Sequence, residues 1–120
     1  MTKRFLARSL SLAAAIIALL MSVTPSSAHP SIDIVASNWT FTPSTITLYV
    51  GERRELRLTS SGGVHGIESK QLGIPLTSIV PGRWINIDVM SKKAGIYVLH
   101  CAVLCGAGHQ NMTLTVKVVP

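Results

Sequence analysis

The residues best suited to chemistry lie in one short segment near the C-terminus. Residues 101–112 contain both cysteines of the chain, Cys101 and Cys105, together with His109 and Met112. Thiolate, imidazole and thioether groups are ligands that favour copper over hard cations. Their spacing is too long for one continuous strand but suits a loop that folds back on itself. Such a loop can direct all four side chains at one point, so the segment predicts a copper-binding loop.

A further ligand is expected from a distant part of the chain, because a metal site needs groups that converge in space. His65 is the candidate, since it follows a glycine-rich turn at the start of a predicted strand. If the strand that contains Leu56 lies beside the strand that contains Tyr97, His65 falls next to the copper loop.

The N-terminal segment has the features of a secretory signal peptide. Three basic residues precede an apolar stretch over residues 10–21, and small residues end at Ala28. We expect cleavage after Ala28, which divides the chain into a signal peptide (1–28) and a mature domain (29–120). The apolar stretch is short for a membrane span, which needs about 20 residues, although an uncleaved anchor is the alternative. We therefore expect a periplasmic or otherwise extracytoplasmic protein with no membrane span in its mature part.

The mature segment is one small domain of modest charge. Eight lysine and arginine residues remain in it against five acidic residues, a net charge of +3. Arg53, Arg54 and Arg57 alternate with acidic residues instead of forming a basic cluster, so no nucleic-acid partner is expected. In an exported protein, two cysteines form a disulfide by default. A structural domain with a Cys101–Cys105 bond is therefore an alternative to the copper loop.

Alternating apolar and polar residues predict an all-β fold for the mature segment. Frequent short strands with turn signals favour a Greek-key β-sandwich, and a site would sit in the loops at one end. The segment 71–82 contains two glycines and two prolines, and we expect it to be a surface loop with one turn of helix at most. The expected strands lie at residues 31–36, 39–41, 46–50, 55–59, 64–69, 84–90, 96–101 and 112–118.

The combined pattern resembles a cupredoxin, and more narrowly the binuclear copper-A domain of cytochrome c oxidase subunit II and of nitrous-oxide reductase. The motif C-x3-C-G-x2-H-x2-M, which begins at Cys101, and the lone upstream His65 carry this resemblance over residues 31–119. A mononuclear blue-copper site would use one cysteine in its loop, not two. The resemblance implies a β-sandwich or barrel of the cupredoxin type. Trp39 is expected to pack in the core or at its rim, with a partner contact as the alternative.

The resemblance also implies two copper ions and a role for each matching side chain. Cys101 and Cys105 correspond to the thiolates that bridge both ions. His65 and Met112 correspond to ligands of one copper. His109 corresponds to the imidazole ligand of the other copper.

Val103 corresponds, through its backbone carbonyl, to a weak oxygen ligand of the second copper, and a backbone ligand tolerates any side chain. Oxidase subunits of the family usually carry an acidic residue here, whose carboxylate reaches a magnesium site, so Val103 is a departure. A second departure is Gly66-Ile67 after His65, where the family has a polar–aromatic pair. The usual transmembrane hairpin is not matched, which favours a free exported form.

The implied centre is that of an electron carrier and not of an enzyme acting on its own. Two thiolates shared by two coppers spread one unpaired electron over both ions, and a rigid frame with a hydrophobic wall limits reorganisation. The expected partners are a c-type cytochrome or another redox protein, and oxidase subunits. Two alternatives stay open: a periplasmic copper chaperone for oxidase assembly, and a mononuclear cupredoxin with small-molecule chemistry.

Overall fold

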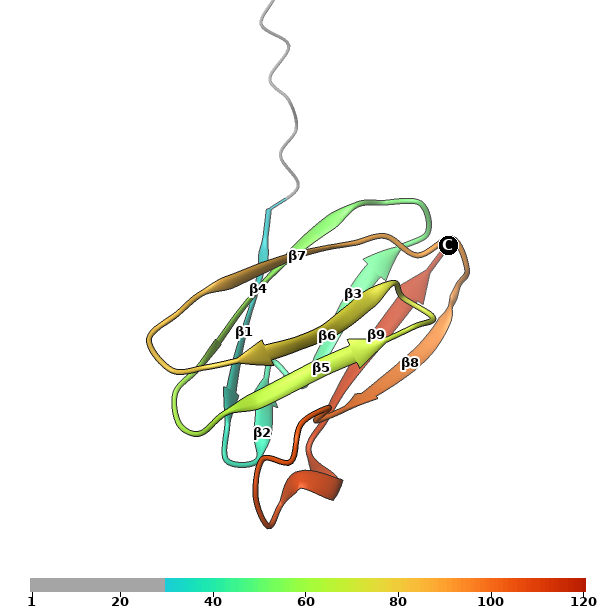
Figure 1. Cartoon of the computed structure of the whole chain (residues 1–120). Coiled ribbons are helices and arrows are strands. Elements are labelled where there is room, and N and C mark those ends of the chain that lie inside the picture. The colour runs from blue at the N-terminus through green and yellow to red at the C-terminus, as the bar shows by residue number, and fades with distance from the viewer. Residues whose placement is uncertain (1–29) are drawn as a thin grey trace, which may run out of the picture.

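The computed structural model describes residues 30–120, which form two β-sheets and a β-hairpin (Figure 1). The predicted signal peptide lies outside the described residues. Within residues 30–120, no helix is long and apolar enough to cross a membrane. In chain order the elements are β1 (Ile32–Ser37), β2 (Thr40–Thr42), β3 (Thr45–Tyr49), β4 (Arg54–Ser60), β5 (His65–Ser69), β6 (Ile74–Ile79), β7 (Ile85–Val89), β8 (Gly95–His100), the 3-10 helix η1 (His109–Asn111) and β9 (Thr113–Val119).

The two larger sheets pack face to face, as the alternating sequence pattern predicts. The first has the strand order β2-β1-β4-β7 and the second has the order β3-β9-β8. In each sheet one pair is parallel, β1 with β4 and β3 with β9, because the chain crosses between the sheets. The predicted β-sandwich is therefore confirmed. Its core contains apolar residues from both inner faces, among them Ile34, Leu56, Leu58, Leu48, Leu99, Leu114 and Val116.

The expectation of a surface loop over residues 71–82 is wrong, because this segment contains strand β6. The strand pairs antiparallel with β5 to form the hairpin. Its burial does not alternate: Ile74 and Ile79 are buried at the two ends, whereas Leu76 between them is exposed. Pro75 is tolerated because β6 pairs on one side only, so no central ladder is broken. The sequence of this strand therefore lacks the alternation of apolar and polar residues by which strands are predicted.

The loop between β8 and β9 lies at one end of the sandwich, beside the β1–β2 turn (Figure 1). Two backbone hydrogen bonds hold it there. The Cys101 amide donates to the Met112 carbonyl at 3.0 Å and closes the base of the loop, and the Ala102 amide donates to the Gly66 carbonyl at 2.9 Å. The second bond ties the loop to β5, the strand that begins at His65.

The strands that contain Leu56 and Tyr97, whose adjacency would bring His65 to the loop, do not pair with each other. Strand β4, with Leu56, pairs with β1 and β7 in the first sheet, whereas β8, with Tyr97, pairs with β9 in the second. It is β5 that packs against β8. His65 reaches the loop for this reason, so the predicted position of His65 is right although the predicted strand neighbours are wrong.

Candidate metal centre

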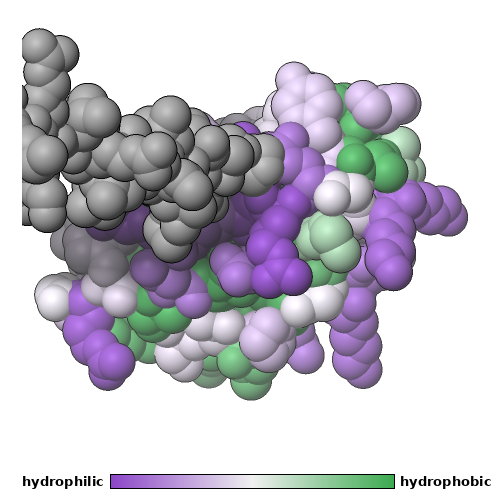
Figure 2. Space-filling model, turned by 90° about the horizontal axis from the view of Figure 1, so that it is seen from above, coloured by the Kyte–Doolittle hydropathy of each residue, from purple (hydrophilic) through white to green (hydrophobic). Residues whose placement is uncertain are grey.

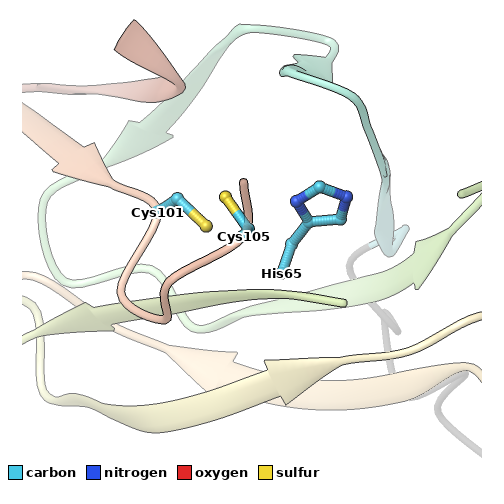
Figure 3. A group of neighbouring side chains, drawn as sticks. All are labelled: His65, Cys101 and Cys105. Atoms are coloured by element: carbon cyan, nitrogen blue, oxygen red, sulfur yellow. The ribbon is translucent and has the colours of Figure 1, made fainter. Parts of the chain in front are cut away.

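Three potential metal ligands converge where the loop meets strand β5. A ring nitrogen of His65 and the sulfur atoms of Cys101 and Cys105 lie within 4.8 Å of one another, and the three side chains point inward (Figure 3). His65 and Cys101 are buried, and Cys105 is partly buried. Both cysteines are free thiols, in contrast to the disulfide alternative. The fold therefore brings a histidine from a distant strand to a pair of unbonded sulfur atoms.

Hydrogen bonding prepares His65 for a ligand on its other nitrogen. The Nε2 atom lies 2.7 Å from the Gly62 carbonyl oxygen, which can only accept, so in the neutral ring Nε2 carries the hydrogen and donates a hydrogen bond to that oxygen. The Nδ1 atom is then an unprotonated acceptor. It is buried and has no hydrogen-bond partner in the part of the chain that the structure describes, at a cost of about 1–3 kcal/mol. A metal ion would satisfy Nδ1, and a carbonyl that accepts from the far ring nitrogen is the usual support of a metal-bound histidine.

The remaining predicted site residues surround the two sulfur atoms. The Cys105 Sγ lies 3.5 Å from Nδ1 of His109 and 3.8 Å from Sδ of Met112. The Cys101 thiol donates a hydrogen bond to the Val103 carbonyl oxygen at 3.3 Å. The structure thus brings all six predicted site residues together, and their assignment as copper ligands remains a prediction.

One turn of 3-10 helix explains the spacing of His109 and Met112. The Met112 amide donates to the His109 carbonyl at 3.4 Å, which closes η1. In this type of helix, residues three positions apart lie on the same side. The H-x2-M spacing therefore directs both side chains toward Cys105.

Trp39, in the β1–β2 turn, packs against the β8–β9 loop. Its indole N–H donates to the Cys105 carbonyl at 3.1 Å. A Cβ on Gly108 would lie 2.4 Å from the indole ring, and one on Gly106 would lie 3.1 Å from its nitrogen. Trp39 is 39% exposed, so it packs at the rim as expected. The contacts of Trp39 with the loop were not predicted. The signal in the sequence is the presence of Gly106 and Gly108, which leave room for the large indole ring.

The chemical state of the thiols affects metal uptake. Partial burial, together with a hydrogen bond and charge repulsion from the neighbouring Cys101, raises the pKa of the Cys105 thiol to about 11. In the metal-free protein this thiol is therefore protonated at neutral pH. Metals bind the thiolate, so uptake releases the proton and is favoured by a higher pH.

Comparison with known proteins identifies the family. The model of the cupredoxin-like domain matches residues 10–116, so the chain belongs to the cupredoxin-like family. Membership of this family implies copper, in agreement with the soft donors of the site.

The relatives of the chain include cytochrome c oxidase subunit 2. That of Thermus thermophilus is 28% identical over 85 residues, which cover 71% of this chain and 62% of the relative. The chain spans 25% to 62% of the length of the first curated relatives that it matches.

Two solved structures have a similar fold. The periplasmic domain of subunit II of cytochrome oxidase from Bradyrhizobium japonicum has a TM-score of 0.69 and 18% identity, covering 77% of this chain and 85% of that one. A chain of a heme-copper terminal oxidase dimer has a TM-score of 0.65 and 26% identity, covering 75% of this chain and 66% of that one. The predicted fold class and the cupredoxin resemblance are thereby confirmed.

Proposed function

We propose that this protein is an extracytoplasmic electron carrier with two copper ions in a copper-A-type site. The observation that carries the proposal is the pair of free cysteines, which converge with a buried histidine on one point. A mononuclear site would need one thiolate, whereas two thiolates can each bridge two ions. The chain's relatedness to oxidase subunit 2 supports the same reading.

The donor set fits a binuclear centre, with two sulfur bridges and two further donors for each ion. Bound copper would supply a one-electron redox centre. The bridging residues would be Cys101 and Cys105, the remaining donors to one ion His65 and Met112, and those to the other ion His109 and the Val103 carbonyl.

The contribution of the protein is to hold these donors still and to exclude water. His65, Cys101 and Met112 are buried within the β-frame, and backbone hydrogen bonds tie the loop to itself and to β5. Solvent exclusion around a metal site controls its local dielectric and its redox potential. The carrier function needs no general acid or base, so we propose no enzymatic activity for this chain alone.

The oxidase-related proteins that resemble this chain support the proposed location and partners. One structural neighbour is a periplasmic domain and another belongs to a terminal oxidase. The partners we propose are a c-type cytochrome or another redox protein, and oxidase subunits.

The chain segments that form the site and the turn that packs against it contain no formally charged side chain. Charged side chains lie on other surfaces: Arg53 and Arg57, for example, face Asp88 and Asp33 at 3.4 and 3.5 Å on the first sheet. Hydrophilic side chains project from the end of the molecule opposite the loop (Figure 2). The stretches that supply the loops around the site and contain no Asp, Glu, Lys or Arg are residues 34–51, 58–67 and 94–116.

Exposed apolar side chains take the place of charges around the site. Leu104 is 88% exposed at the tip of the loop, and Val64, next to His65, is 51% exposed. A redox partner that docks on these segments would meet exposed apolar side chains and no formal charge from the segments themselves. The rate of such an encounter depends weakly on salt, because steering by charge is small.

We therefore expect the second-order rate of electron transfer with a c-type cytochrome to change less than about threefold between low salt and about 0.5 M salt. Stopped-flow measurements on the copper-loaded protein test this. The matched variant Leu104→Glu places one charge on the surface and should make the rate clearly dependent on salt. A steep salt dependence of the unmodified protein would contradict docking at this surface.

Copper loading tests the proposed centre directly. Metal-free protein, loaded with copper under mild reduction, should hold two coppers per chain and become purple. Its electron spin resonance spectrum should show a many-line hyperfine pattern from an electron shared by two copper nuclei. One copper per chain would support a mononuclear cupredoxin. Rapid transfer of copper to an acceptor without electron self-exchange would support a chaperone.

A further inference from the structure

The backbone conformation at position 66 does not require a glycine. It is buried within β5, directly after His65, and pairs with Ser78 of β6. A glycine inside a strand weakens the strand and often marks a place where another group comes close. Gly66 is not among the glycines with positive φ, so no left-handed conformation explains it.

The group that comes close is the side chain of Val103. A Cβ added to Gly66 would lie 2.9 Å from Cγ1 and 3.4 Å from Cγ2 of Val103. It would also lie 3.1 Å from the Thr77 carbonyl oxygen of β6. The isopropyl group of Val103 thus fills the space that any larger residue at position 66 would need.

This contact lies between two bonds that set the path of the loop. On one side, the Ala102 amide donates to the Gly66 carbonyl at 2.9 Å. On the other, the Val103 carbonyl accepts from the Cys101 thiol at 3.3 Å. Val103 also packs against the hydrophobic core. The backbone between the two cysteines is therefore seated on the strand that carries His65.

We propose that Gly66 and the Val103 side chain form a size-matched pair that positions the Val103 carbonyl and the Cys101 sulfur relative to His65. Both are positioning groups and not ligands. A larger residue at 66 lifts the loop from β5, and a smaller one at 103 lets it move. The consequence for copper rests on the proposed function, whereas the seating of the loop does not.

A double-mutant cycle tests the pair on the metal-free protein. The four proteins are the unmodified chain, Gly66→Ala, Val103→Ala and the double variant. Each single change should raise the alkylation rate of Cys101, mapped by mass spectrometry, and the hydrogen-exchange rate of the Ala102 amide by about threefold or more. In the double variant the new Cβ occupies the space of the lost methyl groups, so both rates should fall below those of either single variant. They should not return fully to the original, because the 3.1 Å contact with the Thr77 carbonyl oxygen is not relieved.

Spectra of the copper-loaded proteins provide a second test of the coupling between Gly66 and Val103. The single variants should shift the optical bands and the copper hyperfine splitting, and the double variant should restore them in part. Val103→Thr keeps the branched shape and should change every reading less than Val103→Ala does, so this comparison tests the pair if Gly66→Ala fails to fold. Additive effects in the cycle, or a Val103→Ala protein that behaves like the original, would overturn the inference. Coupling in the metal-free protein without two bound coppers would refute only the proposed function.

Discussion

Replacing Cys105 with serine should lower the copper content of the loaded protein from two ions per chain to one or none. The Cys105 sulfur lies beside His109 and Met112 and belongs to the cluster with His65 and Cys101. It is therefore the donor that is close to the largest number of the other proposed ligands. Serine has nearly the same shape but offers a hard hydroxyl group, which binds copper poorly compared with a thiolate. Elemental analysis and the loss of the purple colour measure the effect.

The same substitution should leave the metal-free fold nearly intact, because Cys105 is only partly buried. We expect its free energy of unfolding to change by about 1 kcal/mol or less. The matched control is Leu104→Ser, which introduces the same side chain at the adjacent exposed position and should retain both coppers. Two coppers with an unchanged spectrum in the Cys105→Ser protein would show that this sulfur is not a bridging ligand.

Replacing His65 with leucine should remove the stabilisation that copper gives, with little effect on the metal-free protein. The change loses one hydrogen bond to Gly62, worth about 1 kcal/mol, but also removes a buried Nδ1 that has no hydrogen-bond partner among residues 30–120. These contributions oppose each other. With free copper about 100-fold above its Kd, the original protein gains about 2.7 kcal/mol, or about 10 °C or more in Tm for a domain of this size. Thermal melts with and without copper measure the difference.

The control for this experiment is His100→Leu. His100 is exposed at the end of β8, adjacent in sequence to Cys101, and should keep the full copper-dependent rise in Tm. An equal rise in the His65→Leu protein would exclude His65 as a ligand. A large loss of stability without metal would instead mean that His65 has a structural role.

These two experiments separate binding from folding because the site is costly without metal. A buried acceptor without a hydrogen-bond partner among residues 30–120 is a feature that a purely structural core would avoid. Functional residues often lower the stability of the protein that contains them, and an unsatisfied buried group is an example. The comparison of metal-free and loaded variants is therefore more informative than either alone.

The amino-acid sequence by itself determined the parts of this protein that depend on local pattern. The C-x3-C-x3-H-x2-M spacing gathers four donors in one loop, because side chains a few residues apart in a turn cannot be far apart in space. Alternation of apolar and polar residues, which follows from the geometry of a strand, located most of the strands. Strand β6 was missed because the buried residues at its ends, Ile74 and Ile79, do not share its period.

Only the tertiary structure decided the contacts between distant segments. Strand pairing depends on the packing of the whole chain, so the sequence could nominate His65 but placed the wrong strands side by side. Two such contacts are the indole of Trp39 against the Cys105 carbonyl and the seating of Val103 on Gly66. Each joins residues that lie in different loops or strands. Local periodicity carries no information about such contacts, because they form only once the two sheets have closed on a common core.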